Sequence, residues 1–87
     1  MNSLSVIFPA FDEEANIRAV VEDAYRHTPE LAPIFEIIVV NDGSKDRTGK
    51  ICDRLAEELS NVRVVHHVRN RGYGAALKSG IKLRTTH

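Results

Sequence analysis

Apolar and polar positions along the chain form six blocks, which predict three strands alternating with three helices. The clearest block is the β-branched run at 37–40, which is too apolar for a half-exposed strand and is typical of a strand covered on both faces. Apolar residues at i, i+3, i+4 and i+7 indicate the helices, because those positions share one helix face. In chain order we predict a strand at 4–8, a helix at 13–27, a strand at 36–41, a helix at 47–60, a strand at 62–66 and a helix at 73–84.

Alternating strands and helices favour a parallel sheet with right-handed crossovers and helices on its faces. We therefore expect an α/β fold, the three-layer half of a doubly wound sheet, with strand order 3-2-1. Thr28-Pro29 is expected to end the first helix, and the first strand would present an unpaired apolar edge through which two chains can associate. On the second helix the residues expected to face inward are Ile51, Cys52, Leu55, Ala56 and Leu59. The residues expected to share one face of their helix are Ile17, Val20, Val21 and Ala24 on the first, and Leu77, Gly80, Ile81 and Arg84 on the third.

The buried central strand runs directly into the polar turn Asn41-Asp42-Gly43-Ser44. Ligands of open parallel sheets bind at that place, beyond the carboxyl ends of the strands. Ser44 or Asp46 can cap the next helix by accepting hydrogen bonds from its free N–H groups. Asp42 is then a carboxylate that capping does not require. It can accept a hydrogen bond from a ring N–H of a nucleotide base, and its alternative role is to shape the turn.

The loop after the first strand, Pro9-Ala10-Phe11, and Glu13 beyond it form a second candidate region. Pro9-Ala10-Phe11 leaves the first strand at its carboxyl end, where a bound nucleotide would need shaped contacts. In the alternative interpretation, Pro9 ends the strand, Phe11 packs as a hydrophobic staple, and Glu13 is a favourable charge at a helix N-terminus. The residue types alone leave both interpretations open.

The segment after the third strand, residues 70–76, reads Asn-Arg-Gly-Tyr-Gly-Ala-Ala. Small residues at a loop-to-helix junction let backbone N–H groups approach an anion, and Arg71 can meet a phosphate. The alternative is that Gly72 and Gly74 allow a tight turn. Leu77 stands where a dinucleotide fingerprint needs its last glycine, and no G-x-x-x-x-G-K-[ST] occurs, so both rival nucleotide motifs are excluded.

In this order and spacing, the three motifs resemble the amino-terminal portion of a family 2 glycosyltransferase, and in particular its polyprenyl-phosphate branch, which is similar to dolichol-phosphate mannose synthase. The resemblance implies a GT-A-type, Rossmann-like fold that binds the nucleotide part of a uridine or guanosine diphosphate sugar. It implies a parent enzyme that transfers a hexose, with a polyprenyl phosphate as the expected acceptor. Many relatives carry two acids where this chain has Asn41-Asp42. The implied nucleotide-binding residues are Pro9, Ala10, Phe11, Glu13, Asp42, Gly43, Arg71 and Gly72.

The metal-binding Asp-x-Asp of the family is expected beyond residue 87. The resemblance therefore assigns no catalytic and no metal-binding residue to this chain, and it implies Mg²⁺ or Mn²⁺ only for the full-length parent. We expect the isolated chain to be inactive. The histidines are not at metal-ligand spacing, and His66 and His67 are adjacent on a strand and must face opposite sides. A non-catalytic nucleotide-binding or assembly module that retained the fold is the alternative function.

Composition and charge add few constraints. The 87 residues are 43% hydrophobic and 28% charged, which is ordinary for a globular domain. Residues 1–62 carry 12 acids and 6 bases, whereas residues 63–87 carry 6 bases and no acid, and a basic segment near the strand ends would suit a diphosphate. The single Cys52 fits packing in a reducing compartment. Neither a signal peptide nor a span of about 20 apolar residues is visible. We expect a soluble, cytoplasmic fragment without a nucleic-acid partner. The full-length parent could still be attached to the cytoplasmic face of a membrane.

Overall fold

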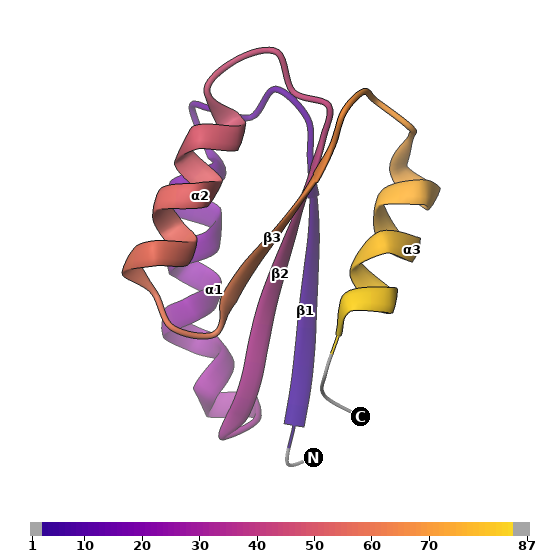
Figure 1. The fold of residues 1–87 in the computed structure, drawn as a ribbon. Coiled ribbons are helices and arrows are strands. Elements are labelled where there is room, and N and C mark those ends of the chain that lie inside the picture. Colours follow the sequence, from indigo (N-terminus) through magenta and orange to yellow (C-terminus); the bar gives the residue numbers. More distant parts are fainter. Residues whose placement is uncertain (1–2, 85–87) are drawn as a thin grey trace.

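Three parallel strands form the middle layer of the structure, a computed structural model that describes residues 3–84 (Figure 1). β2 lies in the centre of the sheet, between β1 and β3. The predicted fold class and strand order are therefore confirmed. The elements are β1 (Ser3–Ala10), α1 (Ile17–Leu31), β2 (Ile34–Asp42), α2 (Thr48–Glu58), β3 (Val62–His67) and α3 (Tyr73–Leu83).

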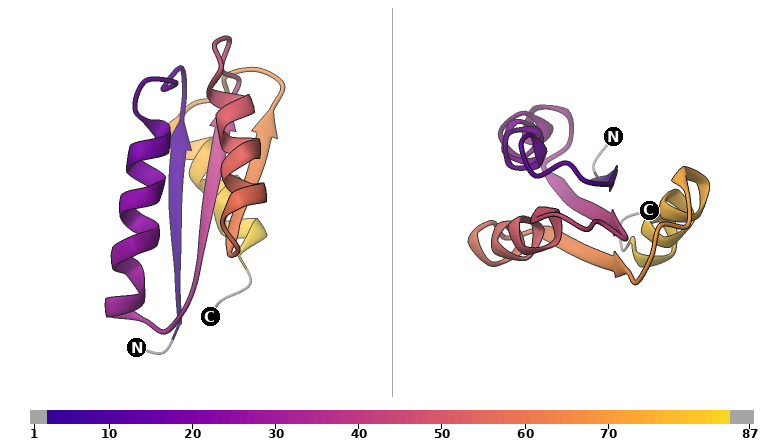
Figure 2. Two further views of the ribbon diagram at one scale, coloured as in Figure 1. Left: turned by 90° about the vertical axis from the view of Figure 1, so that its left-hand side faces the viewer. Right: turned by 90° about the horizontal axis from the view of Figure 1, so that it is seen from above.

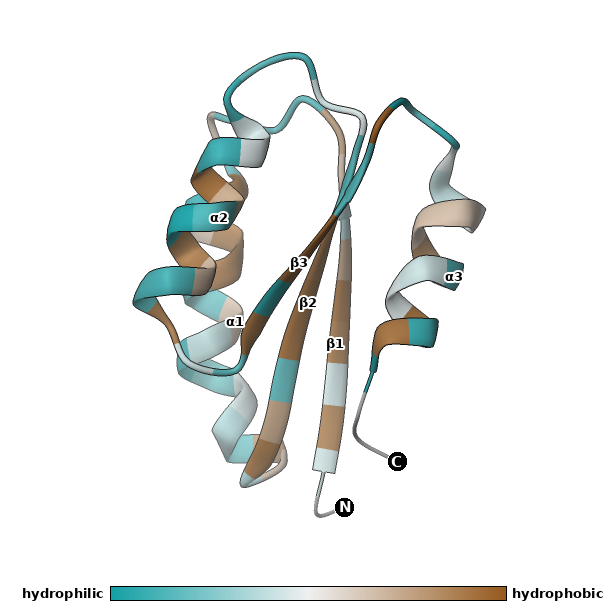
Figure 3. Ribbon diagram, in the orientation of Figure 1, coloured by the Kyte–Doolittle hydropathy of each residue, from teal (hydrophilic) through white to brown (hydrophobic). Residues whose placement is uncertain are grey.

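Helices cover both faces of the sheet. α1 and α2 lie on one face and α3 on the other (Figure 2). Side chains alternate along β2, so Ile37 and Val39 join the core under α1 and α2, whereas Ile38 and Val40 pack with Ala76 of α3. Burying one such side chain contributes about 1.5–3 kcal/mol. Residues 37–40 lie in the hydrophobic middle of the sheet (Figure 3). Both faces are covered there, so none of these four positions is polar.

α3 approaches the sheet through small residues. Ala76 and Gly80 are buried, and a Cβ at Gly80 would lie 2.5 Å from Cγ2 of Ile7. This close approach centres the contact on positions 76 and 80 and turns the next residue outward. Of the residues expected to share one side of this helix, Ile81 is 45% exposed and Arg84 is also exposed.

α1 begins and ends later than predicted. Residues 13–16 form a turn in which the carbonyl of Glu13 accepts from the N–H of Ile17 at 2.8 Å, and the helix begins there. Pro29 lies inside the last turn and does not end the helix at residue 28. A proline this close to the end removes one hydrogen bond of the ladder. The next turn still closes, because the N–H of Ala32 donates to the carbonyl of Thr28 at 3.1 Å.

β1 is an edge strand, paired on one side by β2. Most of its residues are half-buried. Val20, on the predicted apolar face of α1, is 43% exposed, because it lies beside this edge and lines a small hollow with Phe8 and Ile17. The predicted self-association requires such an edge, yet nothing in residues 3–84 supports it further, so it stays a prediction.

Candidate functional site

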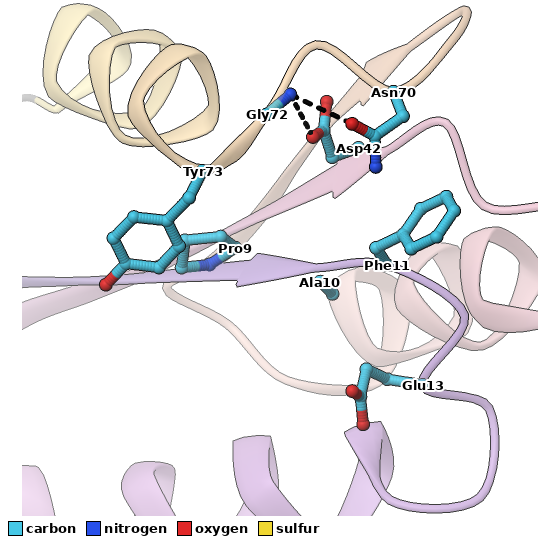
Figure 4. Close-up of a pocket in the computed structure, with 8 residues that line it drawn as sticks. All are labelled: Pro9, Ala10, Phe11, Glu13, Asp42, Asn70, Gly72 and Tyr73. Atoms are coloured by element: carbon cyan, nitrogen blue, oxygen red, sulfur yellow. Dashed lines mark hydrogen bonds between the residues drawn. The ribbon is translucent and has the colours of Figure 1, made fainter.

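The end of β2 and the segments that follow β1 and β3 meet at the carboxyl ends of the strands and line an open pocket of about 300 Å³ (Figure 4). This is where ligands bind in open parallel sheets. The volume lies at the lower limit of ordinary small-molecule sites. The lining residues are Pro9, Ala10, Phe11 and Glu13 from β1 and the loop after it, Asp42 from the end of β2, and Asn70, Gly72 and Tyr73 from the segment leading into α3.

Hydrogen bonds join the loop after β1 to the loop after β2. The backbone N–H of Asp12 donates to Oγ of Ser44 at 3.0 Å, and the Asp12 carboxylate accepts from the N–H of Lys45 at 2.8 Å. The N–H of Glu13 donates to Oγ1 of Thr48, also at 2.8 Å. The pocket wall that follows β1 is therefore fixed against the first turn of α2.

Asn41 and Asp46 shape the turn into α2. Oδ1 of Asn41 accepts from the N–H of Ser44 at 3.2 Å, and Nδ2 of Asn41 lies 2.9 Å from Nδ1 of His66. Oδ1 of Asp46 accepts from Oγ1 of Thr48 at 2.6 Å and from its N–H at 2.9 Å, which confirms the predicted role at the helix start. The hydrogen bond from the Thr48 hydroxyl lowers the pKa of Asp46. Neither side chain lines the pocket.

Asp42 holds the segment between β3 and α3 in place. Its Oδ1 accepts from Nδ1 of His67 at 2.6 Å and from the N–H of Arg71 at 3.0 Å, and its Oδ2 accepts from the N–H of Gly72 at 2.9 Å. The residue is only 4% exposed. Burial by itself would raise the pKa of Asp42, but the hydrogen bonds from His67, Arg71 and Gly72 outweigh it and lower the pKa. Asp42 therefore lines the pocket as an ionised carboxylate at neutral pH.

His67 connects Asp42 to α3 and was not among the predicted site residues. The two residues lie opposite each other in the register of β2 and β3, and Nε2 of His67 is 2.8 Å from Oγ of Ser79. The prediction that His66 and His67 face opposite sides is confirmed, since Nε2 of His66 lies 2.7 Å from Oδ1 of Asp53 on α2. A polar residue at the carboxyl end of the third strand was the available signal for His67.

Two glycines in these segments have a positive φ, and one of them, Gly43, lets the segments pass close together. Gly43 has φ +73°, and a Cβ there would lie 2.3 Å from the carbonyl carbon of Arg69 and the nitrogen of Asn70. Gly43 therefore faces the neighbouring backbone rather than the pocket. Gly72 has φ +96° at the N-cap of α3, and nothing lies within 4 Å of an added Cβ.

The structure brings most of the predicted nucleotide-binding residues together. Gly43 and Arg71 do not line the pocket, and Arg71 contributes its backbone N–H to Asp42. Asn70 and Tyr73 line the pocket although they were not predicted as site residues. A binding role for any of these residues stays a prediction. The predicted residues that do line the pocket are Pro9, Ala10, Phe11, Glu13, Asp42 and Gly72.

The basic segment after residue 62 is divided between the two ends of the sheet. Nη1 of Arg63 donates to Oε1 of Glu36 at 3.2 Å and to the carbonyl of Leu83 at 2.9 Å, far from the pocket end of the sheet. Arg69 and Arg71 belong to the segment beside the pocket, and both are exposed. The expected proximity of the basic segment to the strand ends therefore holds for these two residues but not for Arg63.

The residues that the structure describes do not fit a metal ion. Residues 3–84 contain no group of three or more His, Cys, Asp or Glu side chains that could hold one. His87 lies outside the described residues.

Cys52 is fully buried, and burial raises the pKa of its thiol to about 11, in keeping with the predicted packing role. Within the same described range, none of the helices is long and apolar enough to cross a membrane.

A half-sheet with a pocket beyond its strand ends is the arrangement of nucleotide-binding α/β proteins. The sequence matches the model of Glycosyl transferase family 2 over residues 5–86, and the chain belongs to this family. It is 36% identical to a human dolichyl-phosphate beta-glucosyltransferase and 39% identical to the protein of that name from Dictyostelium discoideum, over 85 residues in each case. Each alignment covers 90% of this chain and 26% of the relative, so the chain spans about a quarter of the length of these relatives.

Solved structures agree with this assignment. The crystal structure of S. aureus TarS 1-349 has a TM-score of 0.74 at 29% identity, covering 97% of this chain and 24% of that one. A structure of the same TarS fragment in complex with UDP has a TM-score of 0.72 at 24% identity, covering 98% and 25% of the two chains. The predicted GT-A-type fold is confirmed.

Proposed function

We propose that this chain forms the nucleotide-binding part of a glycosyltransferase and that its pocket takes the base and ribose of a nucleotide-diphosphate sugar. Membership of glycosyl transferase family 2 supports this function. The related TarS fragment was solved in complex with UDP, which supports a uridine nucleotide as the first candidate. One observation carries the proposal: Asp42 reaches the pocket as an ionised carboxylate that can still accept a hydrogen bond.

An ionised carboxylate has about four acceptor positions, two on each oxygen. His67 and Arg71 occupy both positions on Oδ1 of Asp42, and Gly72 occupies one on Oδ2. The remaining position, on Oδ2, suits a single N–H donor. Uracil and guanine each present a ring N–H, whereas the corresponding ring nitrogen of cytosine carries no proton. The proposed site therefore prefers uridine or guanosine nucleotides to cytidine nucleotides.

The other lining residues suit the rest of the nucleotide. Phe11 and Tyr73 are 42% and 70% exposed and offer aromatic surface to a base. The first-turn N–H groups of α3 have no partner within the helix, and the N-cap Gly72 supplies no side-chain cap. A helix N-terminus of this kind favours the negative charge of a diphosphate. Arg71, exposed just before α3, is the proposed side-chain contact to a phosphate.

For the whole protein we propose transfer of a hexose to a polyprenyl-phosphate acceptor at the cytoplasmic face of a membrane. The curated relatives are named dolichyl-phosphate beta-glucosyltransferases, which supports both the sugar class and the acceptor class. Mg²⁺ or Mn²⁺ is the proposed cofactor of that reaction. It would be bound by residues other than those described here, because residues 3–84 contain no suitable cluster.

Backbone-amide NMR titrations with UDP, GDP and CDP test the proposal. We expect UDP or GDP to shift the signals of Ala10, Asp42 and Gly43, and CDP to bind more weakly. Asp42→Asn keeps the size of the side chain but removes the charge. It should weaken UDP binding by about tenfold or more, because a hydrogen bond to a charged group contributes about 1.5–3 kcal/mol and 1.4 kcal/mol is tenfold.

Asp23→Asn is the matched control, since it removes one exposed carboxylate from α1, outside the pocket. It should leave UDP binding unchanged. Equal UDP affinity in the wild type and Asp42→Asn would remove Asp42 from the site. If no nucleotide shifts any pocket signal in the wild type, the proposed function is wrong for this chain.

A further inference from the structure

Asp42, His67 and Ser79 form a continuous hydrogen-bonded chain that runs from the pocket to the middle of α3. Oδ1 of Asp42 lies 2.6 Å from Nδ1 of His67, and Nε2 of the same ring lies 2.8 Å from Oγ of Ser79. The side chains of Asp42 and His67 are each only 5% exposed. Neither His67 nor Ser79 lines the pocket. The two residues therefore do not contact a ligand in the pocket directly, and Asp42 is the lining residue to which they are hydrogen-bonded.

The direction of these hydrogen bonds follows from the chemistry of the groups. An ionised carboxylate only accepts, so Nδ1 of His67 carries a proton. In the neutral ring Nε2 is then an acceptor, and the hydroxyl of Ser79 donates to it. The opposite tautomer would place the lone pair of Nδ1 against the Asp42 carboxylate. The Asp42 carboxylate thus selects the one neutral form of His67 that can donate to it, and the Ser79 hydroxyl, which can donate or accept, turns to donate to Nε2.

We propose that His67 is a positioning residue for Asp42 and that Ser79 holds the His67 ring in place for this hydrogen bond. Together with the N–H of Arg71, His67 occupies both acceptor positions of Oδ1. Oδ2 is thereby left as the oxygen that accepts from a base. The inference rests on the proposed function for the identity of the ligand, and it goes beyond it by assigning the orientation of the carboxylate to two residues outside the pocket.

The charge of Asp42 depends on the same contact. Burial opposes ionisation of Asp42, and the hydrogen bond from His67 is the largest of the contributions that lower its pKa. The other titratable groups around the pocket are Glu13 from the segment after β1 and Tyr73 at the start of α3, while the exposed Arg71 adds a positive charge nearby. β1 itself contributes only Pro9 and Ala10, which do not titrate. Removal of the His67 donor should therefore raise the pKa of Asp42.

Two variants of nearly equal shape separate positioning from packing. His67→Asn keeps an N–H donor close to the place of Nδ1, whereas His67→Leu has none. We would measure the titration of the Asp42 carboxyl carbon by ¹³C NMR in the ligand-free chain, and the affinity for UDP as a function of pH. His67→Leu should raise the pKa of Asp42 and weaken UDP binding about tenfold or more. On acidification, this variant should lose its affinity for UDP at a higher pH than the wild type does. His67→Asn should restore most of both properties.

His27→Leu is the control, because His27 is an exposed histidine on α1 that lies outside the pocket. It should change neither the titration of Asp42 nor the UDP profile. A purely structural role for His67 would instead weaken UDP binding equally at every pH and leave the titration of Asp42 in place. That result, or identical behaviour of the Leu and Asn variants, would overturn the proposal.

Two readouts keep this test separate from that of the proposed function. If the wild type binds no UDP but His67→Leu still raises the pKa of Asp42, the proposed ligand is wrong and the positioning of Asp42 stands. If His67→Leu does not fold, ¹⁵N NMR of His67 in the wild type and in Ser79→Ala gives the answer. The neutral wild-type ring should carry its proton on Nδ1, and the proton should stay there in Ser79→Ala, because Asp42 selects that form. A proton on Nε2 in the wild type would overturn the proposal.

Discussion

Replacing Gly43 by alanine should cost more stability than the same change at Gly72 or Gly74. The backbone of Gly43 lies at φ +73°, and a Cβ there would come within 2.3 Å of the backbone at Arg69 and Asn70. Real Cβ atoms essentially never approach closer than 3.0 Å, so the segment after β3 would have to move. Gly72 shares the positive φ but has open space, and Gly74 has open space without a positive φ.

The magnitude follows from the strain and from the contacts at risk. Alanine in the left-handed region costs about 1–2 kcal/mol. Moving the segment endangers the hydrogen bonds from Arg71 and Gly72 to Asp42, and each such bond to a charged group contributes about 1.5–3 kcal/mol. With one of these bonds lost, Gly43→Ala should cost about 2.5–5 kcal/mol. Chains of this length have a total stability of roughly 4–13 kcal/mol.

The other two glycines serve as matched controls. Gly72→Ala should cost about 1–3 kcal/mol, because only backbone strain is added. Gly74→Ala should be neutral or stabilise α3 by up to about 1 kcal/mol, because alanine favours the helix. Urea denaturation followed by circular dichroism would measure all three, with the slope checked for two-state behaviour. Equal losses for Gly43→Ala and Gly72→Ala would refute the close packing of the two loops at Gly43.

The remaining predictions concern acid, catalysis and association. Because the pKa of Asp42 is lowered on folding, its ionisation contributes stability above the ordinary aspartate pKa of about 3.9, and this contribution is lost as the pH falls through the lower folded pKa. Urea midpoints measured across that acidic range should therefore slope less in Asp42→Asn than in the wild type, and equal slopes would contradict this assignment. The isolated chain should transfer no sugar with Mn²⁺ or Mg²⁺, because the described residues provide no metal-ligand cluster and a metal ion contributes several kcal/mol of transition-state stabilisation to such reactions. Metal-dependent product in a radiolabelled-sugar assay would show the opposite. Self-association through the β1 edge should appear as dimers in sedimentation at high micromolar concentration, and monomers alone would dispose of it.

The sheet could be predicted because its signals are local. The unbroken apolar run at 37–40 indicated the central strand, and helix-spaced apolar residues indicated the helices on either side. The ends and faces of helices depend on contacts that the sequence does not display. Pro29 is tolerated because it falls in the last turn of α1. Ile81 turns outward because Gly80 lets α3 approach Ile7.

The site could be predicted in part for the same reason. Residues that directly follow parallel strands must meet at one end of the sheet, which is how Pro9 and Asp42 were found. The partners of Asp42 could not be found in this way, because they depend on the register of β3 against β2 and on the position of α3. His67 lies opposite Asp42 in that register, and Ser79 reaches it from a helix that follows in the chain.

Asp42 couples the two halves of the proposed site. Its carboxylate is already held by three protein donors, so a base that binds to Oδ2 meets an acceptor whose charge and direction are fixed in advance. Such preorganisation reduces the ordering cost of binding. The same hydrogen bonds fix Gly72, and with it the N-terminus of α3 where the diphosphate is proposed to lie. A change at Asp42 should therefore weaken both the base contact and the diphosphate contact, whereas a change at the side chain of Phe11 should affect the base alone.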